Sequence, residues 1–122
     1  MPKVNLAEKF SRFSDYWNPR IVGELNGQQV KLAKLKGEFI WHCHDNEDEL
    51  FLVVKGSLEI RLPDQVVHLD AGEFFIVPRG VRHQPAAVGQ PDEAHVLFLE
   101  PASTVNTGSI RNERTVESLE RL

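Results

Sequence analysis

The sequence predicts an all-β fold, either a barrel or a double-sheet jelly roll. Between residues 20 and 101, about eight or nine short strand-like segments follow one another. Gly, Pro, Asn or Asp separates each segment from the next, and no long helical pattern interrupts the series. Many short strands with turn residues between them are typical of closed barrels and jelly rolls.

Length and composition restrict the class of protein. A chain of 122 residues is expected to form a single domain, 1–122, with the barrel core at about 20–101. A net charge of −4 without a basic run argues against nucleic acid or an anionic membrane as partner. One cysteine excludes an intrachain disulfide and fits a reducing compartment. No apolar run approaches about 18 residues and no signal pattern begins the chain, so the expected location is the cytoplasm.

The N-terminal segment predicts a helix over residues 5–17. Apolar residues recur there at steps of four, three and four, namely Leu6, Phe10, Phe13 and Trp17. This spacing forms one helical stripe, with Asn5 as the N-cap and Asn18-Pro19 as the stop signal. We expect the helix to pack on the outside of the sheet.

A hairpin is expected next, because Asn26-Gly27 lies between the strand-like segments 21–25 and 28–36. Asn-Gly favours a two-residue turn in which both central residues need positive φ. The alternation along 28–36 is imperfect, so the sequence leaves the register of this strand open.

The segment 39–44 is expected to be a strand that carries two histidines. Because side chains alternate along a strand, His42 and His44 share one face and Cys43 points to the other. A short acidic loop follows, and Glu49 begins a buried strand over 49–54 that a hairpin brings across from the histidines. Two imidazoles and one carboxylate that converge from neighbouring strands are typical of metal sites.

Further side chains complete the candidate site. His83 follows a stretch punctuated by Gly and Pro and is a fourth candidate ligand. Glu47 and Asp48 are also near the histidines, but they lie in the loop, whereas Glu49 begins a strand and has a fixed direction. The sequence therefore favours Glu49 as the carboxylate of the site.

The remaining strands are expected at 57–62, 66–69, 73–77 and 95–99. Residues 78–80 form a turn that directs 81–83 back toward the sheet. The tail, residues 102–122, is polar, and two interpretations are open. Either Val116, Leu119 and Leu122 form a short helical turn that docks on the barrel or a partner, or the tail is frayed.

The spacing of these residues resembles two motifs of the cupin superfamily, specifically of its small single-domain members. The first motif reads Gly37, His42, His44, Glu49 and Gly56, and the second reads Gly72, Pro78, Gly80 and His83. The resemblance covers 37–87, and the flanking strands extend it to about 20–101. Only four residues separate Gly37 from His42, where five are usual, and Ala87 stands where Asn is frequent. Neither departure removes a candidate ligand.

The resemblance implies a cupin-type double-stranded β-helix, a jelly-roll barrel with a short N-terminal helix and a short C-terminal helical tail. It also implies that His42, His44, Glu49 and His83 bind one divalent transition metal. Nitrogen and oxygen ligands together suit Fe, Mn, Zn, Ni or Cu. Burying three imidazoles and a carboxylate without partners would cost several kcal/mol, which a cation would offset.

The expected function is that of a metal-dependent small-molecule enzyme, of the dioxygenase or the Lewis-acid isomerase or lyase type. A divalent cation with one carboxylate and three neutral imidazoles has a net charge of +1, so we expect a small anionic ligand that chelates through oxygen. The alternative is a non-catalytic cupin that binds or senses a small ligand, because the family includes both kinds of protein.

Several other residues have a predicted place. His95 is a candidate general base at the mouth of the pocket or, alternatively, a surface residue. Phe51 and Phe98 are candidate walls of the substrate pocket, and Cys43 is expected to be a buried thiol rather than a fifth ligand. The face that bears Trp41, Leu50 and Leu52 has more apolar surface than a short helix can cover, which predicts a homodimer.

Overall fold

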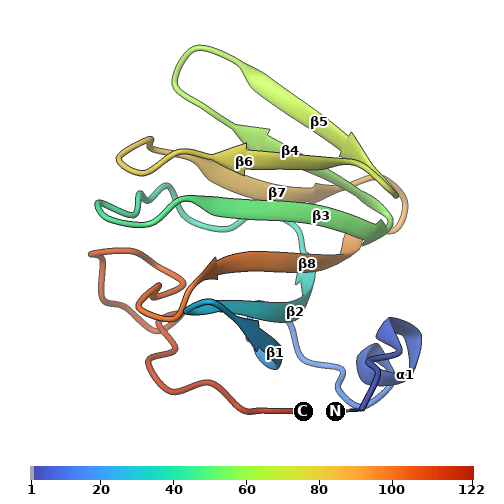
Figure 1. Cartoon of the computed structure of the whole chain (residues 1–122). Coiled ribbons are helices and arrows are strands. Elements are labelled where there is room, and N and C mark those ends of the chain that lie inside the picture. The colour runs from blue at the N-terminus through green and yellow to red at the C-terminus, as the bar shows by residue number, and fades with distance from the viewer. Residues whose placement is uncertain (1) are drawn as a thin grey trace.

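Residues 2–122 are described by a computed structural model, in which two antiparallel sheets face each other (Figure 1). The five-stranded sheet has the order β1-β2-β8-β3-β6, and the three-stranded sheet has the order β5-β4-β7. The strands are β1 (Arg20–Leu25), β2 (Gln28–Lys36), β3 (Glu49–Lys55), β4 (Ser57–Arg61), β5 (Val66–Asp70), β6 (Phe74–Val77), β7 (Gln84–Val88) and β8 (Glu93–Pro101). The predicted all-β jelly-roll architecture is therefore confirmed.

The β1–β2 hairpin turns at Asn26 and Gly27, whose φ angles of 50° and 78° are both positive, as the Asn-Gly signal requires. From this turn β2 pairs with β8 along its whole length, from Gln28 opposite Pro101 to Lys36 opposite Glu93. This long pairing fixes the register of β2, which the sequence left open. Alternate residues of both strands consequently point to the inside of the barrel.

The interior is apolar at one end of these strands and polar at the other. Val53, Leu58, Ile60 and Val96 are completely buried between the two sheets. At the opposite end, β3 begins with the buried Glu49 and β8 ends near the buried Glu100. Lys31 on β2 is also buried at this end. The sheets thus enclose a hydrophobic core and, beside it, a cluster of ionisable groups.

One predicted strand does not form and one observed strand is not predicted, and both lie next to Pro85. Residues 39–44 are extended but form no ladder, because only Glu38 and His42 bridge to the neighbouring segment, at Ala86 and His83. From Glu38 to His42 the chain advances by four residues, whereas from His83 to Ala86 it advances by three, so the two segments do not stay in register. Pro85 also has no N–H to donate. The strand that pairs with β4 is instead β7, which the sequence did not predict because it contains proline and two alanines.

The helix is shorter than the predicted 5–17. Asn5 caps it as expected, with its Oδ1 accepting a hydrogen bond from the Glu8 amide at 3.1 Å, but α1 spans only Leu6–Phe10. Trp17 has a φ of 59°, which a helix does not allow, and it leaves the predicted stripe. Phe10 still packs on the outside of the sheet, in a cluster with Phe13 and Leu32. Within residues 2–122, no helix has the length and apolar character needed to cross a membrane.

The C-terminal tail is docked, but it is not helical. Residues 102–122 form turns, and Arg121 makes a parallel bridge with Ile21. The amide of Leu122 donates to the Ile21 carbonyl at 2.9 Å, and Leu122 packs on the cluster beneath α1. Backbone pairing at a sheet edge therefore fixes this end of the chain, and the expected amphipathic helical turn is absent from these residues.

Candidate metal centre

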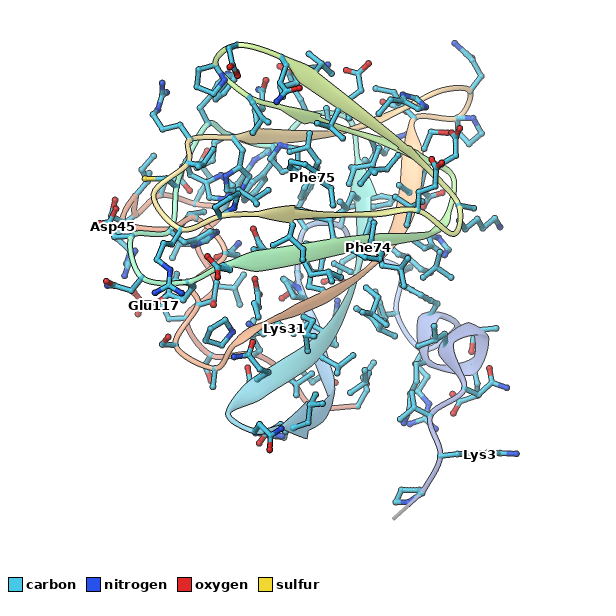
Figure 2. All side chains as sticks on the ribbon, turned by 45° about the horizontal axis from the view of Figure 1, so that its top comes forward. Lys3, Lys31, Asp45, Phe74, Phe75 and Glu117 are labelled. Carbon is cyan, nitrogen blue, oxygen red and sulfur yellow. The ribbon has the colours of Figure 1, made fainter. Side chains whose placement is uncertain are left out.

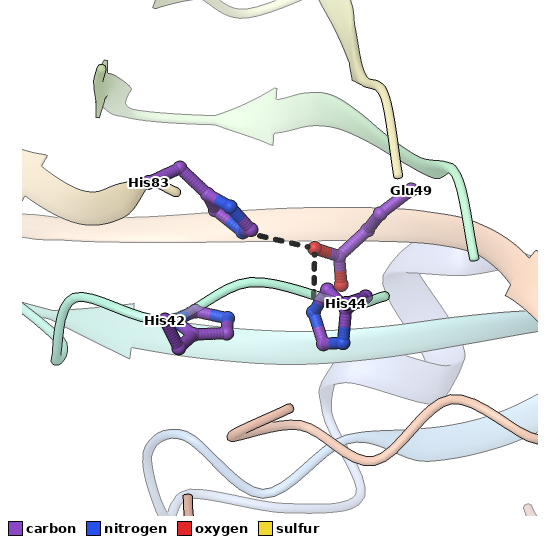
Figure 3. A group of neighbouring side chains, drawn as sticks. All are labelled: His42, His44, Glu49 and His83. Carbon is purple, nitrogen blue, oxygen red and sulfur yellow. Dashed lines mark ion pairs between the residues drawn. The ribbon is translucent and has the colours of Figure 1, made fainter. Parts of the chain in front are cut away.

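The four predicted ligands come together inside the barrel at its polar end. His42, His44, Glu49 and His83 each offer one donor atom, and these atoms lie within 4.8 Å of one another. All four residues are buried, with at most 4 % of their surface exposed. Figure 3 shows the three imidazoles gathered around the Glu49 carboxylate. A cluster of this composition can hold a single metal ion.

Backbone pairing fixes the positions of these side chains. His42 and His83 exchange two hydrogen bonds, from the His42 amide to the His83 carbonyl at 3.0 Å and back at 2.9 Å. His44 lies two residues further along the same extended segment and therefore on the same side as His42. Glu49 is the first residue of β3, which is anchored between β6 and β8. Residues 42–44, the first residue of β3 and the residue before β7 thus present their donors to one place.

Two of the imidazoles are oriented by backbone carbonyls. The Nδ1 atom of His42 lies 3.0 Å from the Ile40 carbonyl, and Nδ1 of His83 lies 3.0 Å from the Val81 carbonyl. A carbonyl can only accept, so Nδ1 carries the proton and Nε2 presents its lone pair. Such a hydrogen bond to the outer ring nitrogen is the usual support of a metal-binding histidine.

The unpaired atoms of the cluster fit a bound cation. Nε2 of His44, Nε2 of His83 and Oε1 of Glu49 are buried and have no hydrogen-bond partner. Oε1 of Glu49 lies 3.4 Å from the first nitrogen and 3.3 Å from the second, longer than the usual 2.9–3.0 Å for a hydrogen bond (Figure 3). Unpaired buried groups are costly, and one divalent cation would satisfy these three. Nδ1 of His44 is also buried without a partner and would not contact the same ion.

The electrostatics of the cluster favour the metal-binding forms of His42 and Glu49. Burial, together with the neighbouring His83, lowers the pKa of His42 to about 4, so this imidazole is neutral near pH 7. Burial opposes the charge on Glu49, but the contacts with Glu100, His44 and His83 outweigh it and hold the pKa of Glu49 well below its ordinary value. A neutral imidazole and an ionised carboxylate are the forms that bind metals.

Sequence reasoning missed two buried residues beside the cluster. Nζ of Lys31 lies 2.9 Å from Oε1 of Glu100, and the Glu100 carboxyl lies against Glu49. Burial and the charge of Glu49 raise the pKa of Glu100 well above its ordinary value. The alternation along the last strand would have placed Glu100 inside with Val96 and Phe98, but the sequence interpretation ended that strand at Leu99.

A cavity opens beside the cluster and is lined by His42 and Glu49. Phe51 and Phe98, the two predicted pocket residues, also line it, with their ring centres 5.0 Å apart. Trp17 lies at this cavity as well, stacked on Phe39. The cavity therefore has aromatic walls and includes two of the metal-binding candidates, His42 and Glu49, in its lining.

The competing carboxylates near the histidines have other partners. Asp48 pairs with Arg79 at 3.3 Å, and Glu47 accepts a hydrogen bond from Ser103 at 3.1 Å. Among the residues that the structure describes, Glu49 is thus the carboxylate that joins the histidines. Cys43 lies outside the cluster, with its Sγ 3.7 Å from Asp45.

The structure does not bring His95 to the cavity. Its ring stacks on Phe10 of α1, with the ring centres 4.8 Å apart, on the outer face of the five-stranded sheet. The inward-facing neighbours Ala94 and Val96 are fully buried in the core, and alternation places His95 on the opposite side. His95 therefore lies on the other side of the sheet from the metal-binding candidates, which agrees with the alternative of a surface residue rather than a general base.

Comparison with known proteins agrees with this architecture. A family model described as a cupin domain matches residues 28–100. The uncharacterized protein YdbB of Bacillus subtilis is 36% identical over 80 residues, which make up 65% of this chain and 65% of that protein. The chain thus matches slightly less than two thirds of the length of this relative.

Solved structures give the same result. A cupin-2 domain containing protein from Shewanella frigidimarina is 43% identical, with a TM-score of 0.76 over 80% of this chain and 93% of that chain. Protein NMB1881 from Neisseria meningitidis is 26% identical, with a TM-score of 0.74 over 83% of this chain and 100% of that chain. The fold of both proteins is similar to the one described above.

Proposed function

The chain belongs to the cupin family, and on this premise we propose that it binds one divalent transition metal and acts as a metal-dependent small-molecule enzyme. His42, His44, Glu49 and His83 would hold the metal. The observation that carries the proposal is the cluster of their buried donor atoms, all within 4.8 Å, of which several have no hydrogen-bond partner. A cluster with this arrangement is costly unless a cation occupies it.

The chain's own residues define what such a site can do. When bound, the metal would supply Lewis acidity or, if it is redox-active, reactivity toward dioxygen. The carbonyls of Ile40 and Val81 keep two imidazoles oriented, and the Phe51 and Phe98 rings form apolar walls of the cavity. One carboxylate against a divalent cation leaves a charge of +1. The site therefore suits a small anionic ligand that binds through oxygen atoms.

The second candidate is a cupin that binds or senses a small ligand without catalysis. The position of His95 favours it, because this candidate general base lies on the far side of the sheet from the cluster. A binding protein needs the metal and the cavity but no group that transfers protons. The identity of the metal and a test for turnover distinguish the two functions.

Elemental analysis of untagged protein tests the proposal. We expect about one equivalent of metal in the wild type, and loss of most of it in His44→Ala, because His44 supplies one of the four donors. His95→Ala is the matched control and should keep its metal, since His95 is outside the cluster. A His44→Ala variant with unchanged metal content would show that the ligand assignment is wrong.

The metal found then separates the functions. Iron together with oxygen uptake on a panel of small hydroxy and oxo acids supports an oxygenase. Zinc or nickel with turnover but no oxygen uptake supports Lewis-acid chemistry. Saturable binding of panel members without turnover supports the binding protein.

A further inference from the structure

The cavity beside the metal cluster is smaller than the ligand that the proposed function requires. Its volume is about 30 Å³, which gives room for about two water molecules. Even the smallest chelating anions, such as oxalate, are larger than this space, and protein cavities that hold small-molecule ligands have volumes of about 300–1,000 Å³. Part of the cavity wall must therefore move before such a ligand reaches the metal-binding candidates.

Two side chains form the solvent side of this cavity. Among the described residues that line it, Trp17 and Asn106 are partly exposed, and the others are buried. The Asn106 amide is fixed at both of its ends, because Oδ1 accepts from the Val116 amide at 2.9 Å and Nδ2 donates to the Arg114 carbonyl at 2.7 Å. Trp17 instead follows the exposed residues 14–16 of a surface loop. Trp17 is thus the side of the mouth that is free to move.

Trp17 closes the mouth in a costly backbone conformation. Its φ of 59° lies in the left-handed region, which a bulky residue rarely adopts and which often marks a functional site. Its amide donates to the Lys34 carbonyl at 2.9 Å, and its Nε1 donates to the Lys36 carbonyl at 3.0 Å. The indole stacks on Phe39 with the ring centres 4.6 Å apart, and Phe39 meets His42 edge-on at 5.5 Å. A strained residue therefore lies over the cavity, one ring away from a candidate metal ligand.

We propose that Trp17 is the gate of the metal site and controls the entry of small oxygen-chelating anions. The proposal rests on the metal site proposed above. In the closed state the indole lies on Phe39, and the cavity admits only molecules the size of water. In the open state residues 14–18 move away from the mouth. Opening breaks the stack and the hydrogen bonds of Trp17 but also releases its backbone strain, so the open state is a minor, accessible one.

Removal of the metal by a coloured chelator tests the gate. Zinc-loaded protein is mixed with 4-(2-pyridylazo)resorcinol, whose absorbance changes when it binds zinc. At low chelator concentration Trp17→Ala should lose zinc about tenfold faster than the wild type or more, as expected when about a tenth of the wild-type molecules or fewer are open. At high concentration the wild-type rate should reach a plateau set by opening, whereas the rate of the variant should continue to rise.

Tyr16→Ala is the matched control, because it removes the neighbouring aromatic side chain of the same loop. Tyr16 is 40% exposed and does not line the cavity, so this variant should lose zinc at the wild-type rate. If Trp17→Ala does not fold, Trp17→Gly makes the same test, since glycine accepts a positive φ without strain.

Zinc content, measured first, separates the gate from the metal site. A wild type that cannot be loaded with about one equivalent of zinc contradicts the proposed function. A loaded wild type that loses zinc as fast as the Trp17 variant contradicts only the gate. Faster loss in the Trp17 variant that does not depend on chelator concentration also contradicts the gate, because it shows a weakened site rather than an opened path.

Discussion

The hydrogen bonds of His42 and His83 to backbone carbonyls determine how these two imidazoles act. Each carbonyl fixes the proton on Nδ1 and so leaves Nε2 free to bind a metal. Burial reinforces this state for His42, whose pKa falls to about 4. Nε2 of both imidazoles is therefore available to a cation, and the stability of metal-free protein should decrease in acid.

The stability of metal-free protein should decrease as the pH falls from 7.5 to 5. The unfolded chain protonates His42 near its ordinary pKa of 6.5, whereas the folded chain does so only near 4. Between these values the unfolded state binds more protons, so stability rises with pH and falls with acidification. The contribution of His42 is about 2 kcal/mol between pH 7.5 and pH 5. Urea denaturation of chelator-treated protein at several pH values measures it.

His42→Leu is the variant that isolates this effect. The substitution removes the titrating group, so the dependence on pH between 7.5 and 5 should become shallower. His95 titrates in the same direction, because burial lowers its pKa as well, and His95→Leu therefore serves as a comparison. Equal slopes in the wild type and in His42→Leu would contradict the account.

The two motifs that the sequence shares with the cupin family could predict the four members of the cluster, but not the pair beside it. The two motifs carry His42, His44, Glu49 and His83 at fixed offsets in the chain, so a local pattern identifies them. Lys31 and Glu100 are 69 residues apart and meet only because β2 pairs with β8 along its whole length. No local pattern contains that register.

At the scale of elements, the segment 103–117 closes the fold over the histidine-bearing segment. Thr107 is fully buried, and Asn106 lines the cavity. Arg114 donates to the Glu38 carbonyl at 3.1 Å and lies over the Phe39 ring. Gly108, with a φ of 64°, packs directly against the backbone of Cys43, between the two histidines. This segment is therefore the outer support of residues 38–44, which lack a ladder of their own.

Gly108→Ala should destabilise the protein more than an ordinary substitution of a glycine with positive φ. A Cβ atom at this position would overlap the Cys43 carbonyl oxygen, and the conformation itself costs about 1–2 kcal/mol for a residue other than glycine. Gly72→Ala is the control, because its φ is also positive, at 88°, but nothing lies within 4 Å of the added Cβ. Urea denaturation should give a loss of about 3 kcal/mol or more for Gly108→Ala and about 1–2 kcal/mol for Gly72→Ala.

The metal content of Gly108→Ala provides a second measurement. Because the overlap is with the residue between His42 and His44, a displaced segment should also weaken metal binding. Equal losses of stability in the two glycine variants would show that residues 103–117 do not support this part of the fold.

Pairing partners also explain which elements the sequence could predict. The β1–β2 hairpin follows from two adjacent residues, Asn26 and Gly27, and was predicted correctly. β7 depends on β4, which comes more than twenty residues earlier, and its own composition of Pro85 and two alanines gives no strand signal. Long-range pairing therefore decides the elements that local propensity cannot.

At the scale of the whole molecule, the outer face of the five-stranded sheet is covered near β2 but exposed at its β6 edge. The cluster around Phe10, Phe13 and Leu32 lies beneath α1, at the β2 side of the sheet (Figure 1). At the other edge, Phe74 and Ile76 of β6 are 60% and 47% exposed. Phe74 and its neighbour Phe75 point to opposite faces of β6, and Phe75 packs against the core (Figure 2).

The apolar surface of β6 continues onto the next strand. Leu52 is paired with Phe74 and Leu50 with Ile76, so these four side chains share the outer face. β6 is also the edge strand of its sheet, with backbone groups free on one side. Trp41, which the sequence analysis placed on this face, belongs instead to the segment beside β7 and lies under Arg82.

This surface leads us to predict a homodimer that buries Phe74 and Ile76. A second copy offers the same apolar face, and a two-fold axis lets each copy cover the other, as in most homodimers. Size-exclusion chromatography with light scattering at micromolar concentration should give twice the mass of the chain. Phe74→Glu/Ile76→Glu places charges in the interface, so this variant should give the mass of one chain and keep its metal, because both side chains point away from the barrel interior.

Leu25→Glu is the control that adds a charge outside the proposed interface. Leu25 is 50% exposed at the end of β1, at the opposite edge of the sheet. It should remain dimeric. A wild type with the mass of one chain would contradict the dimer, and a dimeric Phe74→Glu/Ile76→Glu variant would assign the interface to another surface. Because Glu49 faces the inside of this sheet, the three histidines lie outside it, and Phe74 and Ile76 face outward, assembly and metal binding should respond independently to substitutions at these positions.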